Sequence, residues 1–121
     1  MTRLLVLFIL IILLSACPAQ KQVMESPQNS VLESIYSKVS GGQIEICLLG
    51  NDSVYTASIN AYDAPTDIYS YQGKVIGTCN YAFNLVDSIC YNLQNCRTVY
   101  RGINHINGEP FIDLYNLEKK H

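Results

Sequence analysis

The longest hydrophobic stretch of the chain lies at its amino terminus, where eleven consecutive apolar residues occupy positions 4–14 behind one cation, Arg3. No position in this stretch is polar, so it lacks the two-sided pattern of an amphipathic helix. It is also too short to span a membrane, which takes about 20 apolar residues. A short apolar core behind a positive charge is typical of a signal peptide, and we predict that residues 1–16 are removed during export.

Residues 30–40 have the spacing of an amphipathic helix. Their apolar side chains recur at three- and four-residue intervals, and the two glycines that follow are typical of a helix end. Ser30 and Glu33 also have the spacing of a capping box. We therefore predict one short helix, with a buried face formed by Val31, Leu32, Ile35, Tyr36 and Val39.

Beyond these glycines the pattern changes to the alternation of apolar and polar residues that is typical of strands. Ile44 and Ile46 fall on one face of the first such segment, and Glu45 and Cys47 fall on the other. Turn residues separate the extended segments, so neighbouring strands are expected to pair as hairpins. The predicted strands are residues 43–48, 54–62, 68–71, 74–79 and 97–101.

The remaining segments are less regular. Residues 84–93 carry an apolar stripe at helical spacing, which favours a short second helix. Residues 102–121 are expected to be mostly loop, with some buried apolar content near residues 111–117.

These elements together indicate an α+β fold, with one N-terminal helix followed by a mainly antiparallel sheet of about four to five strands. We predict a signal peptide at residues 1–16, a polar tether at 17–29, one small domain at 30–117 and a charged tail at 118–121. The formal net charge is −2 at pH 7, and removal of Arg3 makes the remaining chain more acidic. A nucleic-acid partner is therefore not expected.

The end of the apolar stretch is informative about localisation. Leu14-Ser15-Ala16-Cys17 resembles the lipobox of bacterial lipoproteins, in which an aliphatic residue and two small residues precede a cysteine. The resemblance implies that the Cys17 thiol receives a diacylglycerol group, that the chain is cut before it, and that the protein is held on an envelope membrane. The alternative is an ordinary cleavage after Ala19, which would release a soluble secreted protein.

The four cysteines outside this region are Cys47, Cys79, Cys90 and Cys96. An even number of cysteines in an exported chain predicts two disulfides, and the three possible pairings are equally compatible with the sequence. Zinc sites use close cysteine pairs or neighbouring histidines, neither of which is present, so neither a metal nor another cofactor is expected.

Tyrosine is the one abundant residue type that suggests a binding role, because its ring can be buried while its hydroxyl stays in water. Tyr62, Tyr69, Tyr71 and Tyr81 surround the second predicted hairpin and form a possible contact surface for an envelope protein or a glycan. Packing as half-buried strand residues is the alternative. The spacing of tyrosine, glycine and cysteine over residues 69–79 also resembles that of small uncharacterised envelope proteins, a resemblance that implies no activity.

Three short patterns match modification sites. Asn51 begins an N-glycosylation pattern, and Ser53 and Ser88 each follow an aspartate and precede an aliphatic residue, which resembles a bacterial O-glycosylation pattern.

No catalytic motif surrounds a serine or a cysteine, and we predict that the protein is not an enzyme. His105 and His121 stand apart from other candidate catalytic residues and are expected to be solvated. The favoured function is a membrane-anchored envelope lipoprotein that acts as a binding or structural module. Its alternatives are a soluble secreted protein such as an inhibitor, and a small hydrolase that uses His105 with Asp113 or Glu109.

Overall fold

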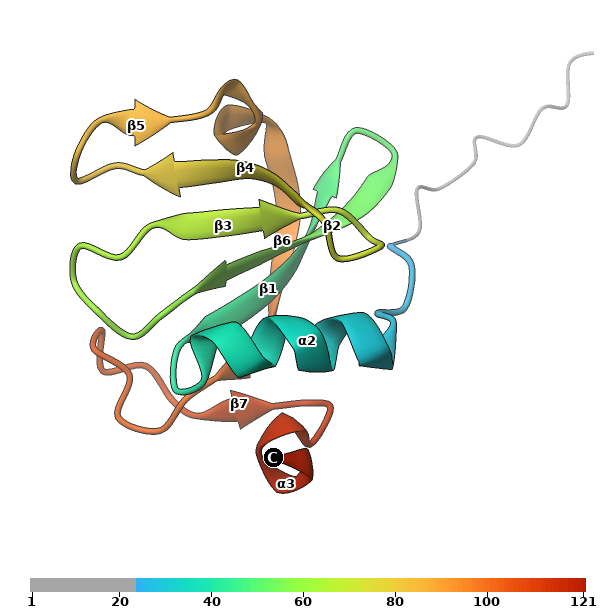
Figure 1. Ribbon diagram of the computed structural model, residues 1–121, viewed down its shortest axis with the longest axis vertical. Helices are drawn as coiled ribbons and strands as arrows, with labels where there is room; N and C mark the ends of the chain where they lie inside the picture. The colour runs from blue at the N-terminus through green and yellow to red at the C-terminus, as the bar shows by residue number, and fades with distance from the viewer. Residues whose placement is uncertain (1–23) are drawn as a thin grey trace, which may run out of the picture.

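The computed structural model describes residues 24–121, which form one helix-covered antiparallel sheet (Figure 1). The sheet has seven strands in the order β5-β4-β3-β2-β1-β6-β7. The predicted combination of an N-terminal helix, an antiparallel sheet and two disulfides is confirmed. The predicted count of four to five strands is too low, because the two edge strands are each two residues long and show no alternation in sequence.

The elements follow one another with short connections. In chain order they are α2 (Asn29–Val39), β1 (Gln43–Leu49), β2 (Asp52–Ser58), β3 (Thr66–Tyr69), β4 (Val75–Asn80), β5 (Leu85–Val86), the 3-10 helix η1 (Ser88–Asn92), β6 (Leu93–Arg101), β7 (Ile112–Asp113) and α3 (Leu117–Lys120). None of the helices within residues 24–121 is long and apolar enough to cross a bilayer.

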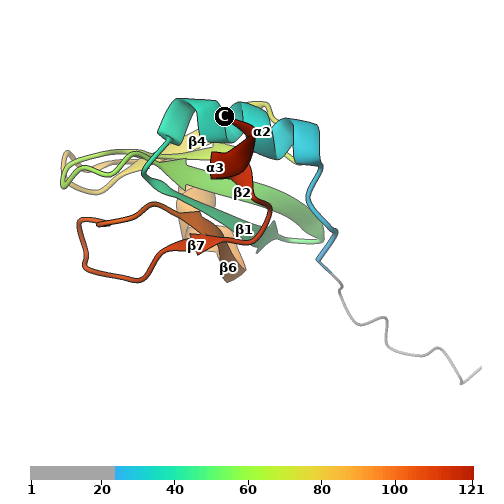
Figure 2. The ribbon, with the colours of Figure 1, turned by 90° about the horizontal axis from the view of Figure 1, so that it is seen from below.

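Helix α2 lies across one face of the sheet, as Figures 1 and 2 show. Four of its five predicted core residues are buried, and Val31 packs partly against them. The capping-box prediction is wrong, because the residue before the helix is Gln28 and no side chain caps the first turn. Glu33 instead binds the Lys120 ammonium group at 2.9 Å, which joins α2 to α3.

The space between α2 and the sheet holds the larger of two hydrophobic clusters. We call this side of the sheet the helix face. Its buried residues come from α2, four central strands and α3, and they are Leu32, Ile35, Tyr36, Val39, Ile44, Ile46, Tyr55, Ala57, Tyr69, Val99, Tyr100 and Leu117.

The opposite side of the sheet, which we call the cysteine face, has a smaller cluster. It consists of Cys47, Val54, Ile68, Cys79 and Cys90, with partly buried neighbours from β5, η1 and the start of β6. Ile44 and Ile46 belong to the helix face and Cys47 to the cysteine face, as the alternation in β1 predicts. β1 therefore contributes to both clusters.

The short helix predicted over residues 84–93 is found only in part, as the 3-10 helix η1 at Ser88–Asn92. Asn84 has a left-handed backbone (φ 54°), which a continuous α-helix does not accommodate, and the segment divides into β5 and η1. Asp87 fixes the segment to β4, because its carboxylate accepts a hydrogen bond from the Thr78 amide at 2.8 Å. The Asp87 amide in turn donates to the Thr78 carbonyl at 3.2 Å.

Residues 24–28 dock on the domain before α2 begins. The Glu25 amide donates to Ser53 Oγ and the Gln28 amide to the Tyr55 hydroxyl, both at 3.0 Å. The Tyr71 hydroxyl donates to the Ser26 carbonyl at 2.7 Å. This part of the predicted tether is therefore bonded to β2 and to the β3–β4 turn.

Candidate functional site

Residues 24–121 contain two disulfides, Cys47–Cys96 and Cys79–Cys90. Cys79–Cys90 joins β4 to η1 and closes a short segment that contains β5. Cys47–Cys96 joins the neighbouring strands β1 and β6, and its cysteines are separated by 49 residues in the sequence. The sequence predicts two disulfides, and the structure selects this pairing from the three that the sequence leaves open.

A β-bulge places Cys96 beside Cys47. Ile46 pairs with Arg97 and Leu48 with Gln94, so the single residue Cys47 faces two residues of β6, Asn95 and Cys96. Asn95 has a left-handed backbone (φ 52°), a conformation that asparagine adopts more readily than most residues. Bulges of this kind redirect side chains, and here the bulge brings two cysteines of adjacent strands together.

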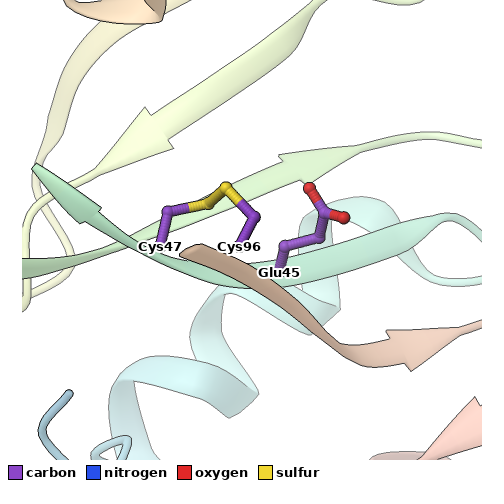
Figure 3. A group of neighbouring side chains, drawn as sticks. All are labelled: Glu45, Cys47 and Cys96. Carbon is purple, nitrogen blue, oxygen red and sulfur yellow. A yellow bond between two sulfur atoms is a disulfide. The ribbon is translucent and has the colours of Figure 1, made fainter. Parts of the chain in front are cut away.

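Glu45 lies next to this disulfide on the same side of the sheet, as Figure 3 shows. Its carboxylate accepts hydrogen bonds from the Thr56 and Thr98 hydroxyls, each at 3.4 Å. A carboxylate oxygen and the sulfurs of Cys47 and Cys96 all lie within 4.8 Å of one another. These three residues have ligand types that suit a metal, but the two sulfurs are bonded to each other and only the carboxylate is available as a ligand.

Sequence reasoning placed Glu45 on the same strand face as Cys47 but did not single it out as a site residue. The available signal is its position two residues before Cys47 in an alternating strand, which places the carboxylate and the thiol on one face. The position of Cys96 gives no such signal, because the bulge that aligns it appears only when β1 and β6 pair.

A second candidate site lies at one end of the sheet. Residues 59–65, 81–84 and 102–111, which we call the distal loops, connect β2 to β3, β4 to β5 and β6 to β7. Figures 1 and 2 show these loops at the end of the sheet opposite to residues 24–28. They carry six of the large hydrophobic residues that the described chain exposes, namely Ile59, Tyr62, Tyr81, Phe83, Ile103 and Phe111.

Asn60 ties two of the distal loops together. Its side-chain oxygen accepts a hydrogen bond from the Ile106 amide at 2.7 Å, and its side-chain nitrogen donates to the Asn104 carbonyl at 3.4 Å. A cleft of about 130 Å³ lies between these loops. Tyr62, Thr66, His105 and Asn107 are among its lining residues, so the cleft combines an aromatic ring with several polar groups.

Among the described residues, His105 forms no hydrogen bond or ion pair with Asp113 or Glu109. It is buried, with 8% of its surface exposed, which corrects the prediction of a solvated side chain. Asp113 accepts hydrogen bonds from the Leu117 and Glu118 amides and so begins α3. Glu109 forms an ion pair with Arg101 at 3.0 Å. Both carboxylates of the hydrolase alternative therefore have other partners.

The four tyrosines proposed as a contact surface have different environments. Tyr62 and Tyr81 are exposed in the distal loops. Tyr69 is buried in the helix face, and Tyr71 stacks on Tyr55 with ring centroids 6.3 Å apart. Tyr69 is thus part of the core, as its alternative interpretation predicts, and only Tyr62 and Tyr81 remain as candidate contact residues.

The predicted modification residues also differ in exposure. Asn51 and Ser88 are exposed, whereas Ser53 is buried and accepts the hydrogen bond from Glu25. Ser53 is therefore not accessible for glycosylation in the folded domain. Cys17, the predicted lipidation site, lies outside the described residues.

Comparisons of this chain with protein-family models, with curated proteins and with solved structures found no match.

Proposed function

We propose that this protein is an exported envelope lipoprotein, anchored through Cys17, whose domain binds a partner through its distal loops. The observation that carries the proposal is the position of six exposed hydrophobic residues at one end of the sheet, with residues 24–28 at the other end (Figure 2). A lipid on Cys17 would approach the domain from the side of residues 24–28. The distal loops would then be turned away from the membrane.

The composition of the distal loops supports a partner that is not strongly charged. Their acidic residues are Asp63 and Glu109, and Glu109 is already paired with Arg101. Aromatic residues such as Tyr62, Tyr81 and Phe83 favour contact with apolar protein surfaces or with the faces of sugar rings. The proposed partner is therefore an envelope protein or a glycan.

Binding is tested by replacing Tyr62, Tyr81 and Phe83 together with serine. These side chains are exposed, so the variant should keep the stability of the wild type while it loses capture of a partner from cross-linked envelope fractions. The matched control is Tyr91→Ser, because Tyr91 is also exposed but lies on η1. Equal capture by wild type, triple variant and control would reject the distal loops as the binding surface.

Anchoring is tested separately with Cys17→Ser. The wild type should sediment with membranes, resist extraction by salt and enter the detergent phase, because acyl chains attach by burial of hydrocarbon rather than by charge. The variant should remain an uncleaved precursor or become soluble. Wild-type protein recovered in soluble form with Gln20 at its amino terminus would favour the secreted alternative.

A further inference from the structure

We propose that Cys47–Cys96 is a site of thiol–disulfide exchange, at which an external low-molecular-mass thiol attacks the sulfur of Cys96. We propose further that Glu45 makes this site select against anionic thiols. The inference rests on the geometry of β1 and β6 and does not depend on the proposed binding function.

The two disulfides differ in how a thiol can reach them. Cys96 is an exposed residue of β6, whereas its partner Cys47 is fully buried. Cys79 and Cys90 are both buried on the cysteine face, with 4% and 8% of their surfaces exposed. Exchange requires direct contact between the attacking thiolate and one sulfur, so access directs the attack to Cys96.

The sheet around the disulfide can stay folded when the bond between Cys47 and Cys96 is broken. Glu45 pairs with Thr98 on one side of the bulge, and Leu48 pairs with Gln94 on the other. The backbone of β1 is also paired with β2 along its whole length. Pairing on both sides of the bulge holds β1 to β6, and pairing with β2 holds β1 in the sheet, whether or not the sulfurs are bonded. Exchange therefore does not require the domain to unfold.

The chemical step is a substitution at sulfur. A thiolate forms a new S–S bond with Cys96 Sγ, the Cys47–Cys96 bond breaks, and Cys47 leaves as a thiolate that takes a proton from water. Cys47 can reverse the reaction by attacking the mixed disulfide. A second external thiol can instead attack that mixed disulfide, which releases the oxidised external thiols as a disulfide and leaves Cys47 and Cys96 reduced.

The carboxylate of Glu45 lies where it acts on the charge of the incoming thiol. Hydrogen bonds from Thr56 and Thr98 hold it beside both sulfurs (Figure 3). A negative charge at this distance repels an anionic thiol and attracts a cationic one. Arg97 follows Cys96 in sequence and is exposed, but its pairing with Ile46 places it on the helix face, so removing the charge of Glu45 isolates the effect of the carboxylate.

The site of attack is tested on the folded full chain with 2-mercaptoethanol. After a short exposure, free thiols are alkylated and the peptides are mapped by mass spectrometry. We expect the mixed disulfide on Cys96, alkylation of Cys47 and an intact Cys79–Cys90 bond, with the near-ultraviolet circular dichroism of the folded protein retained. A first adduct on Cys47, Cys79 or Cys90, or reaction only in denaturant, would overturn the proposal.

The role of Glu45 is tested by comparing cysteamine, which is cationic, with mercaptoethanesulfonate, which is anionic. Rate constants are expressed per thiolate so that thiol acidity does not affect the ratio. Glu45→Gln keeps the shape of the side chain and one oxygen that can accept a threonine hydrogen bond, while its amide nitrogen can donate to the other threonine hydroxyl. It should lower the preference for cysteamine by about three- to tenfold.

The matched control is Asp63→Asn, which removes the same charge from the exposed distal loop at residues 59–65. This variant should keep the wild-type preference. An unchanged ratio in Glu45→Gln, or an equal change in Asp63→Asn, would show that Glu45 does not select the thiol.

Discussion

The two faces of the sheet are stabilised by different means. The helix face buries twelve residues beneath α2 and α3, and all twelve are apolar or aromatic. The cysteine face buries five, and three of these are half-cystines. A small domain has limited apolar surface to bury, so covalent links supplement packing where no α-helix covers the sheet.

Removal of the disulfides should give the largest effect. In the chain-entropy description, a disulfide that closes a longer loop contributes more stability. The sequence separation is 49 residues for Cys47–Cys96 and 11 for Cys79–Cys90. Replacing Cys47 and Cys96 by serine should therefore cost about 4 kcal/mol, and replacing Cys79 and Cys90 about 3 kcal/mol. Urea unfolding of both double variants measures the difference. A larger loss from the second pair would show that packing around η1, rather than loop length, sets the contribution.

Truncating a buried side chain of the helix face should lower the free energy of unfolding by a similar amount. Leu32 is fully buried between α2 and the sheet, so Leu32→Ala should lower the free energy of unfolding by about 3 kcal/mol. The control is Leu85→Ala, because Leu85 is 68% exposed and its truncation should change stability by less than about 0.5 kcal/mol. Similar losses from both leucines would contradict the burial that defines the helix face.

A smaller effect is expected where residues 24–28 dock. Tyr71→Phe removes the hydrogen bond to the Ser26 carbonyl but keeps the ring that stacks on Tyr55, so it should cost about 1 kcal/mol. Hydrogen exchange at the amides of Glu25 and Gln28 should become faster, while exchange in β1 stays slow. Tyr91→Phe, at an exposed tyrosine of η1, should leave both measurements unchanged.

The smallest effect on stability near neutral pH is expected from the tyrosines of the helix face. This effect should grow as the solution becomes alkaline. Burial raises the pKa of Tyr100, and the hydrogen bond that its hydroxyl donates to Glu118 raises it further. Burial also raises the pKa of Tyr55 and Tyr69. A raised pKa gives stability that is present below the ordinary tyrosine pKa of about 10 and is lost as the pH rises above it.

Unfolding measured between pH 8 and pH 11.5 tests this expectation. The wild type should lose stability above about pH 10, and Tyr100→Phe should lose less over the same interval. Tyr62→Phe is the control, because Tyr62 is 84% exposed and should not alter the slope. A wild-type stability that is constant across this interval would contradict the burial of the tyrosine hydroxyls.

Long periodic segments were predictable from the sequence, and short or irregular ones were not. The helical spacing of Leu32 and Ile35 and the alternation at Ile44 and Ile46 each extend over a whole element, so they predict both its type and its buried face. β5 and β7 are too short to carry a pattern. Their positions depend on pairing with β4 and β6, which sequence periodicity does not reveal.

The candidate sites show the same limit. The number of disulfides follows from the cysteine count, but their pairing depends on the bulge at Asn95, which only the paired strands contain. Tyr62 and Tyr69 are equally plausible contact residues in the sequence. Their burial differs in the structure because β2 ends at Ser58, which leaves Tyr62 in a loop. Tyr69 lies in β3 beneath α2.

The docking of residues 24–28 has a geometric consequence for a lipid-anchored form. Since Met24 packs against the domain, only the chain between Cys17 and Met24 separates the lipid from the folded surface. Even a fully extended chain of this length reaches about 25 Å, which is less than the thickness of a bilayer core. The anchored domain would therefore stay close to the headgroups, and its distal loops, turned away from the membrane, would reach a partner that projects from this membrane or lies just above its surface.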